Sequence, residues 1–309
     1  MKGVYENTMN HKLTTEQRNE RSEQLDQLSA REIITLMNEE DQKVPLAVKQ
    51  ALPQIERAIE AIVNKMANGG RLFYIGAGTS GRLGILDAAE CPPTFGTDKE
   101  LVTAIIAGGS QAIFEAVEDA EDNGEVGRDE VRTRLHSGDV LVGIAASGRT
   151  PYVLGAVQEA KKLGILTVGL SCNTATPLSQ WVDYAIEVSV GPEVVTGSTR
   201  LKAATAQKLV LNMMSTATMI RLGKIYKNLM VNVQATNDKL RHRVINIVME
   251  ATPTTEDEAR RYCDLAKGDA RVAILMLQCK VDYSTVVQAL DKSGGHFGRA
   301  RGQLMVQGK

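Results

Sequence analysis

Five short apolar runs, separated by segments of helical length, place the strongest constraint on how this chain can fold. The runs lie at residues 72–75, 101–106, 140–145, 166–170 and 184–190. Segments with helical pattern lie between them, at residues 84–90, 112–121 and 152–163. Because crossovers between parallel strands are right-handed and lay each helix over the sheet, this alternation predicts helices on both sheet faces. The expected fold class is α/β, a three-layer αβα sandwich with a five-stranded parallel sheet.

The segments that flank the runs carry no strand signal. The first 30 residues are charged and lack periodicity, so we expect an arm that lies on another surface. Ser29 and Glu32 have the spacing of a capping box, and a helical pattern covers residues 44–66. Downstream, we expect a long helix over residues 198–221, mostly helix over 225–250, and a small all-α domain after Pro253.

Composition excludes several classes of protein. With 43% hydrophobic and 24% charged residues, the 309-residue chain can bury a large core and is not expected to be disordered. The 36 Lys and Arg balance 37 Asp and Glu, and aromatics are only 4%, which argues against nucleic-acid and membrane partners. Four scattered cysteines predict neither zinc nor disulfides. With no signal sequence or apolar span, we expect a cytoplasmic protein.

A Gly-rich turn follows the first apolar run. Residues 76–82 read Gly-Ala-Gly-Thr-Ser-Gly-Arg and lead into a helix, so backbone N–H groups and hydroxyls can face an anion. The spacing also satisfies the dinucleotide fingerprint, but the acid expected about 20 residues later is absent, because Ile105-Ile106-Ala107-Gly108-Gly109 stands there. The alternative to an anion site is a tight turn with a purely structural role.

A second turn of the same kind follows the third run. Residues 146–151 read Ala-Ser-Gly-Arg-Thr-Pro, with Pro151 suited to start a helix. In a sheet of order 2-1-3-4-5, the first and third strands are neighbours, so both turns would face one crevice. Hydroxyls at two helix N-termini suit a phosphate held without a metal, and neither turn is followed by the lysine of a nucleotide-binding P-loop. A phosphosugar therefore fits better than ATP.

Three glutamates are candidates for acid–base chemistry. Glu90 ends an apolar helical segment just before Cys91-Pro92-Pro93, while Glu118 and Glu121 belong to an acidic stretch. For Glu90 a solvated helix end is the simpler interpretation, and for the other two an acidic surface is. Spacing alone does not decide between these interpretations. The basic stretch over residues 200–243 supports an anionic ligand weakly, because a solvated helix face explains it as well.

Four motifs together resemble the N-acetylmuramic acid 6-phosphate etherase family. They are Gly76 to Arg82, Glu90 to Pro93, Ile144 to Tyr152, and above all the signature stretch from Gly191 to Lys208, which is shared with the glucokinase regulatory proteins. The resemblance runs from about Leu13 to the C-terminus. It implies a sugar isomerase (SIS) domain, a three-helix ubiquitin-associated-like C-terminal domain and a homodimer with active sites near the subunit interface. The boundaries that we expect are 1–56 for the arm and first helices, 57–221 for the SIS domain, 222–252 for connecting helices and 253–309 for the C-terminal domain.

The resemblance also implies a reaction and a set of residues. The family removes the D-lactyl ether of N-acetylmuramic acid 6-phosphate and needs no redox cofactor or metal. Glu90 is similar to the family's proton donor and Glu121 to its second catalytic glutamate, which we assign as the base at C2. Glu90 must then hold a proton near pH 7 while Glu121 stays ionised. The residues expected to bind the phosphosugar are Gly78, Thr79, Ser80, Gly81, Glu118, Ser147, Gly148, Arg149, Thr150, Ser198 and Lys202.

Other classes fit the sequence less well. A non-catalytic phosphosugar sensor would resemble the glucokinase regulatory proteins, but those are longer and hold two such domains. A transcriptional regulator would need an amino-terminal helix-turn-helix, and residues 1–50 show no convincing basic recognition helix. A phosphosugar isomerase is the nearest enzymatic rival. A related aminotransferase would need a glutamine-hydrolysing domain with an amino-terminal cysteine, whereas the first cysteine here is Cys91.

Overall fold

A five-stranded parallel sheet of order β2-β1-β3-β4-β5 forms the centre of the fold in the computed structural model, which describes residues 13–233 and 238–307. All four strand pairings are parallel, which confirms the predicted fold class. The strands are β1 (Leu72–Gly76), β2 (Val102–Ile106), β3 (Val140–Ile144), β4 (Leu166–Ser171) and β5 (Tyr184–Glu187).

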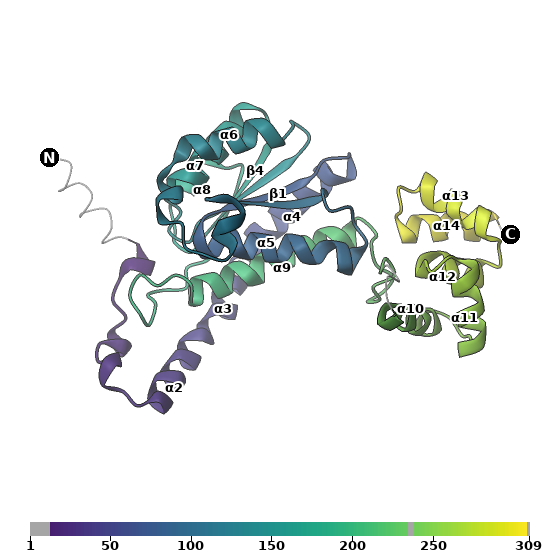
Figure 1. Cartoon of the computed structure of the whole chain (residues 1–309), viewed down its shortest axis with the longest axis horizontal. Coiled ribbons are helices and arrows are strands. Elements are labelled where there is room, and N and C mark those ends of the chain that lie inside the picture. The colour runs from purple at the N-terminus through teal and green to yellow at the C-terminus, as the bar shows by residue number, and fades with distance from the viewer. Residues whose placement is uncertain (1–12, 234–237, 308–309) are drawn as a thin grey trace. The chain divides into compact units, whose positions relative to one another are not determined.

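Helices cover both faces of this sheet, as the alternation predicted (Figure 1). One face is covered by α6 (Gly124–Arg134), α7 (Pro151–Lys162) and α8 (Pro177–Trp181), and the opposite face by α4 (Leu52–Ala67), α5 (Gly78–Phe95) and α9 (Lys202–Arg221). Successive strand residues point to opposite faces. Phe73 and Ile75 accordingly pack in the core beneath α6 and α7, whereas the Tyr74 hydroxyl donates a 2.9 Å hydrogen bond to Asp87 of α5.

The amino-terminal arm consists of short elements. They are the 3₁₀ turns η1 (Thr14–Glu16), η2 (Glu20–Ser22) and η3 (Leu25–Gln27), followed by α2 (Ala30–Asp41) and α3 (Lys43–Gln50). The predicted capping box is confirmed, since the Ser29 N–H donates to the Glu32 carboxylate and the Glu32 N–H donates to the Ser29 hydroxyl. The single helix expected over residues 44–66 is instead divided at Ala51. Pro53 lies in the first turn of α4, where its missing N–H costs nothing.

The expected helix over residues 112–121 is wrong. The chain forms two 3₁₀ turns there, η4 (Gly109–Ile113) and η5 (Glu118–Asp122), and α6 begins only at Gly124. Asn123 caps α6 by accepting hydrogen bonds from the N–H groups of Glu125 and Val126. The cap places the helix start after the acidic stretch, because a side-chain acceptor at this position satisfies N–H groups that a longer helix would bond internally.

A helical region follows α9. Its helices are α10 (Asp238–Ala251), α11 (Glu256–Leu265), α12 (Ala270–Cys279), α13 (Tyr283–Lys292) and α14 (Phe297–Gln307). They share an apolar core that includes Val248, Ile274 and Phe297. In the described part of the chain after Pro253 there are four helices, where the resemblance implied three. Helix was expected over most of residues 225–250, but α10 begins only at Asp238; residues 234–237 lie outside the described part of the chain.

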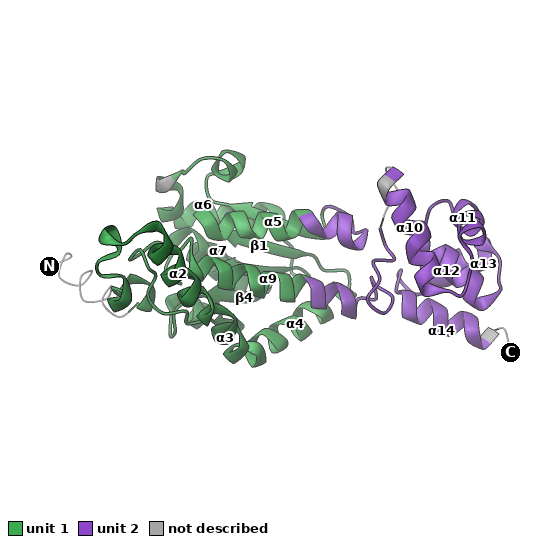
Figure 2. Cartoon of the chain, turned by 90° about the horizontal axis from the view of Figure 1, so that it is seen from below, with its two compact units in different colours: residues 1–89, 100–215 green, residues 90–99, 216–309 purple. Residues whose placement is uncertain are grey.

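The chain divides into two compact units (Figure 2). The first contains residues 1–89 and 100–215, and the second contains residues 90–99 and 216–309. Both α5 and α9 begin in the first unit and end in the second. None of the described helices combines the length and the apolar character needed to cross a bilayer.

Helices α6 and α7 pack with their backbones in close contact. A Cβ atom on Gly127 of α6 would lie 2.0 Å from the carbonyl oxygen of Tyr152, and one on Gly155 of α7 would lie 2.1 Å from that of Gly124. Neither carbonyl can move without breaking its helix, so these two positions accept only glycine.

We expect Gly127→Ala to destabilise the first unit by at least about 2 kcal/mol, because the steric clash outweighs the helix propensity that alanine adds. Urea unfolding followed by fluorescence of Trp181, the only tryptophan, measures this change. Gly138→Ala is the matched control, since no heavy atom lies within 4 Å of the added Cβ. Equal unfolding midpoints for the two variants would contradict the packing described.

Candidate active site

The two Gly-rich loops leave the sheet side by side. Strands β1 and β3 pair in parallel with Gly76 opposite Ile144, so both strands end at the same level. The loop after β1 leads into α5, and the loop after β3 leads into α7. The predicted strand order is therefore confirmed, and it brings the two helix N-termini to one edge of the sheet.

The first turn of α5, which carries Thr79 and Ser80, holds one of these two hydroxyls in the interior. Ser80 is buried, and its Oγ donates a 2.9 Å hydrogen bond to Oε1 of Gln207 on α9. Thr79 is half-buried. Gln207 is itself buried, and its Nε2 has no hydrogen-bond partner among the described residues. Gln207 could not be predicted from the sequence, because a polar residue inside a helical segment gives no sign of a partner 127 positions away.

Arg82 ties the first loop to the segment after β2. Its Nε donates to the carbonyl oxygen of Ile113 at 3.0 Å, and its Nη2 donates to that of Glu115 at 2.8 Å. These carbonyls lie just before η5, which carries Glu118 and Glu121. In this structure Arg82, the last residue of the Gly-Thr-Ser-Gly-Arg motif, therefore holds the backbone before η5 in place.

The second loop leaves hydroxyls available for a ligand. Gly148 has a φ of 67°, and a Cβ there would lie 2.4 Å from Cβ of Thr176, so no other residue fits. Oγ of Ser147 accepts a 3.2 Å hydrogen bond from the N–H of Arg149 and keeps its own hydrogen to donate. Thr150 is the N-cap residue of α7, but its side chain makes no capping hydrogen bond. Two hydroxyls and a helix N-terminus can therefore bind an anionic group such as phosphate.

The amino-terminal arm braces this second loop through Asn173. The carbonyl oxygen of Ala146 accepts a 3.0 Å hydrogen bond from Nδ2 of Asn173. Oδ1 of Asn173 in turn accepts hydrogen bonds from the Thr14 hydroxyl at 3.0 Å and from the Thr15 N–H at 3.3 Å. The arm therefore contributes to the position of residues 146–150, although none of its residues is a ligand candidate.

The structure places Glu121 on an element that packs against α7. It lies exposed in η5, which contacts α7. Three residues later, Gly124 abuts the start of α7, because a Cβ there would lie 3.1 Å from the carbonyl oxygen of Pro151. Glu118 belongs to the same turn. Glu90 is exposed on α5 and belongs to the second unit, so its catalytic role stays a prediction.

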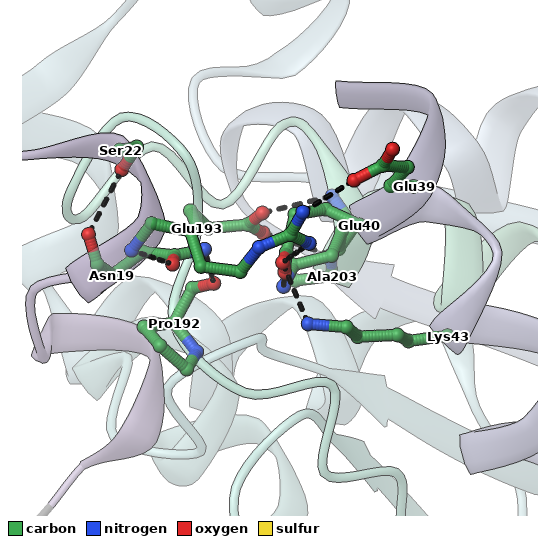
Figure 3. A network of polar contacts seen from close by, with 10 residues as sticks. Asn19, Ser22, Glu39, Glu40, Lys43, Pro192, Glu193 and Ala203 are labelled. Atoms are coloured by element: carbon green, nitrogen blue, oxygen red, sulfur yellow. Dashed lines mark hydrogen bonds and ion pairs between the residues drawn. The ribbon is translucent and has the colours of Figure 1, made fainter. Parts of the chain in front are cut away.

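The signature stretch forms a buried polar network at the N-terminus of α9 (Figure 3). The carboxylate of Glu193 accepts hydrogen bonds from the N–H groups of Lys202 at 3.1 Å and Ala203 at 2.9 Å. The Lys202 side chain is only 2% exposed, and its Nζ lies 2.7 Å from Oε2 of Glu40 on α2. Ser198 is half-buried in the preceding turn. The network gives Lys202 a structural partner, and substrate binding by Lys202 and Ser198 stays a prediction.

Two carboxyl groups of this network titrate differently. Burial raises the pKa of Glu193, although the two N–H donors of α9 oppose the shift. Burial would also raise the pKa of Glu40, but hydrogen bonds and positive charge from Lys202 and Lys43 outweigh it and lower that pKa from 4.5 to about 2. Glu40 is thus ionised whenever the fold is intact near neutral pH.

A further buried carboxyl, Asp87, joins α5 to α9. It accepts hydrogen bonds from Asn212 at 2.7 Å and from Ser215 at 3.0 Å, in addition to Tyr74. Burial raises its pKa, and these hydrogen bonds limit the shift. Asp87 could not be predicted from the sequence, because two of its three donors lie more than 120 positions away along the chain.

Two protein-family models match the region that carries the sheet and the loops. Residues 54–161 match the glucokinase regulatory protein N-terminal SIS domain, and residues 111–217 match the SIS domain. These matches cover β1 to β5, both Gly-rich loops and the signature stretch. The chain is therefore a SIS-domain protein.

Relatives of nearly the same length identify the family. An N-acetylmuramic acid 6-phosphate etherase from Geobacillus sp. (strain WCH70) is 50% identical over 293 residues, covering 94% of this chain and 99% of the relative. One from Glaesserella parasuis serovar 5 (strain SH0165) is 53% identical over 288 residues, covering 93% and 95%. The chain belongs to the N-acetylmuramic acid 6-phosphate etherase family. Among solved structures, a phosphoheptose isomerase from Francisella tularensis matches at 21% identity with a TM-score of 0.48, covering 62% of this chain and 98% of that one.

The titration of Glu40 predicts how the network responds to acid. Because the pKa of Glu40 is lower in the folded chain, its stabilising contribution is complete above pH 4.5 and is lost as the pH falls toward 2. Glu40→Gln leaves the buried ammonium group of Lys202 without its salt-bridge partner, which costs about 3–5 kcal/mol at neutral pH. We expect the difference in unfolding free energy between wild type and variant to shrink between pH 4.5 and pH 2.

Urea unfolding at several pH values between 2 and 7 measures this difference. Glu39→Gln is the control, because Glu39 is exposed and pairs with Arg21 at the surface. A difference that stays constant down to pH 2 would contradict the assigned titration.

Proposed function

We propose that this chain cleaves the D-lactyl ether of N-acetylmuramic acid 6-phosphate, giving N-acetylglucosamine 6-phosphate and D-lactate. It is then a carbon–oxygen lyase that acts in the cytoplasm in the recycling of cell-wall amino sugars. Identity of about 50% to relatives of that name over more than nine-tenths of the chain carries the proposal. The two loops at one sheet edge support it, because they offer uncharged donors and a helix N-terminus to a phosphate.

The phosphosugar occupies the edge of the sheet where the two loops meet. Ser147 and Thr150 offer their hydroxyls, Gly148 keeps the backbone close, and α7 offers N–H groups at its N-terminus. At the start of α5, Thr79 and the backbone of residues 78–81 are expected to contact the same phosphosugar. Arg149 and Glu118 are expected to contact the sugar. The functional form is a homodimer with sites near the subunit interface.

The reaction is an elimination followed by addition of water. Opening of the sugar ring exposes the C1 aldehyde, which makes the proton on C2 acidic. Glu121 removes that proton, the bond between C3 and the ether oxygen breaks, and Glu90 protonates the departing oxygen to give D-lactate. Water then adds to C3 of the unsaturated aldehyde and C2 regains a proton. The atoms balance as a net hydrolysis, so no electron acceptor is needed.

Breaking the bond at C3 predicts the fate of isotopes from water. Incubation of purified protein with the substrate in ¹⁸O-water should place the label in the C3 hydroxyl of the sugar product and none in lactate. In deuterated water, deuterium should appear at C2. Mass spectrometry of both products measures this. Binding of the phosphosugar without lactate release would contradict the proposal and favour a sensor.

Variants of the two glutamates separate their roles. We expect Glu90→Gln to lower lactate release by roughly 10²- to 10⁴-fold while exchange of the C2 proton continues. Glu121→Gln should stop both lactate release and C2 exchange, because no base then removes the proton. Exchange is followed by NMR in deuterated water. Glu125→Gln is a matched control on the exposed surface of α6. Exchange at the wild-type rate in Glu121→Gln would overturn the assignment.

A further inference from the structure

The second unit contains a cavity of about 530 Å³ that includes Glu90 in its lining. One wall is formed by the end of α5 and the residues that follow it, up to Lys99. The other wall is formed by Met230 and by the beginning of α10, including Arg243. The etherase proposal assigns a role to Glu90 alone, so the other groups in this cavity need an explanation.

The two walls are fixed to each other by a backbone contact. Gly96 has a φ of 61°, and a Cβ there would lie 2.2 Å from the carbonyl oxygen of Asn232. Asn232 is buried, and its Nδ2 donates a 2.5 Å hydrogen bond to the carbonyl oxygen of Lys224. The segment after α5 and the segment before α10 therefore form one scaffold, and the cavity is a feature of that scaffold.

The polar groups of the cavity suit a carboxylate. Lys99 and Arg243 contribute two exposed cationic side chains. Thr97 is 7% exposed, and its hydroxyl has no hydrogen-bond partner within the described residues. A buried hydroxyl without a partner costs about 1–3 kcal/mol, a penalty that an acceptor on a ligand removes. Asp98 also lines the cavity, but its charge acts on the half-buried Lys224 as well.

We propose that this cavity binds the carboxylate of the substrate's lactyl group, with Arg243 and Lys99 as the cations and Thr97 as a hydroxyl donor. The inference rests on the proposed function. In a lactyl ether, the carboxyl carbon and the ether oxygen are attached to the same carbon atom. A cavity that holds the carboxylate therefore holds the ether oxygen within reach of an acid in the same lining, which is the role proposed for Glu90. Because Glu90 lies about 18 Å along α5 from Gly78, the loops that hold the phosphate of this substrate belong to the partner in the proposed homodimer.

The charge of the lining changes during the reaction in a way that favours release of the product. While Glu90 carries its proton, Lys99, Arg243 and Asp98 leave one net positive charge for a carboxylate. When Glu90 gives its proton to the ether oxygen, the C3–oxygen bond breaks, lactate gains its hydroxyl hydrogen, and the lining becomes neutral. Attraction for the lactate carboxylate falls at the moment when lactate has to leave.

Two substrates that differ in one charge test the inference. The first is N-acetylmuramic acid 6-phosphate, and the second is its primary amide, in which the lactyl carboxylate is replaced by a neutral group of similar size. We expect wild type to prefer the acid by roughly 10- to 100-fold in kcat/KM. Arg243→Ala should lose about that factor on the acid and less than about threefold on the amide. Arg243→Lys should recover part of the preference, because it restores the charge.

Arg241→Ala is the matched control, because Arg241 lies on the same helix and pairs with Asp238 outside the cavity. Thr97→Val removes the hydroxyl at nearly constant side-chain volume. This variant should also lower the preference in kcat/KM for the acid over the amide. An equal loss on both substrates would assign Arg243 to a group that they share, such as the phosphate, and would overturn the inference. The inference would also be overturned if the well-folded variants Arg243→Ala and Thr97→Val kept the wild-type preference for the acid over the amide. If wild type releases no lactate from the acid, the proposed function falls and the inference falls with it.

Discussion

The parallel pairing of β1 with β3 is the constraint on which the proposed phosphate site depends. With Gly76 opposite Ile144, the two strands end at one level, so the helices that follow them begin side by side. A shift of register by one residue would turn the strand side chains to the wrong faces of the sheet. Phe73 and Ile75 are buried on one face and Tyr74 on the other, and this packing opposes such a shift. Burial of the sheet thus fixes the position of the loops.

A second layer of support comes from segments far away in the sequence. Asn173 holds Ala146 next to the second loop and is itself held by Thr14 and Thr15 of the arm. Glu40 of α2 holds Lys202, at the start of the long helix that also carries Gln207. The most distinctive stretch of the sequence therefore includes residues whose observed partners belong to the fold rather than to a ligand.

The sequence predicted what local patterns encode. The five strands and the Ser29–Glu32 capping box follow from periodicity and from short-range spacing, whereas the strand order was taken from the common doubly wound arrangement. The predicted helix over residues 112–121 was wrong because the Asn123 cap, which decides where α6 starts, lies outside the stretch whose pattern suggested it. The positions of both Gly-rich loops followed from the strand order, because parallel strands expose their carboxyl ends at one edge.

What the sequence could not supply were contacts between distant residues. The Ser80 hydroxyl donates a hydrogen bond to Gln207, which lies 127 positions away in the sequence, and Lys202 donates one to Glu40, which lies 162 positions away. No periodicity links such pairs, since each depends on how the helices cross the sheet. The cavity around Glu90 was unpredictable for the same reason. Its walls come from chain segments far apart in the sequence, which the contact of Gly96 with Asn232 brings together.

The contact of the arm with Asn173 has a practical consequence for handling the protein. A protease that cuts between Gln17 and Ser29 would leave every strand and every sheet-covering helix in place, so far-ultraviolet spectra would barely register the damage. The cleaved peptide, however, carries Thr14 and Thr15. Its dissociation would remove two hydrogen bonds from Asn173, so the second loop would be held less firmly. A nicked preparation would thus look folded while holding its phosphosugar less firmly, and the intact mass of the chain is the better measure of sample quality.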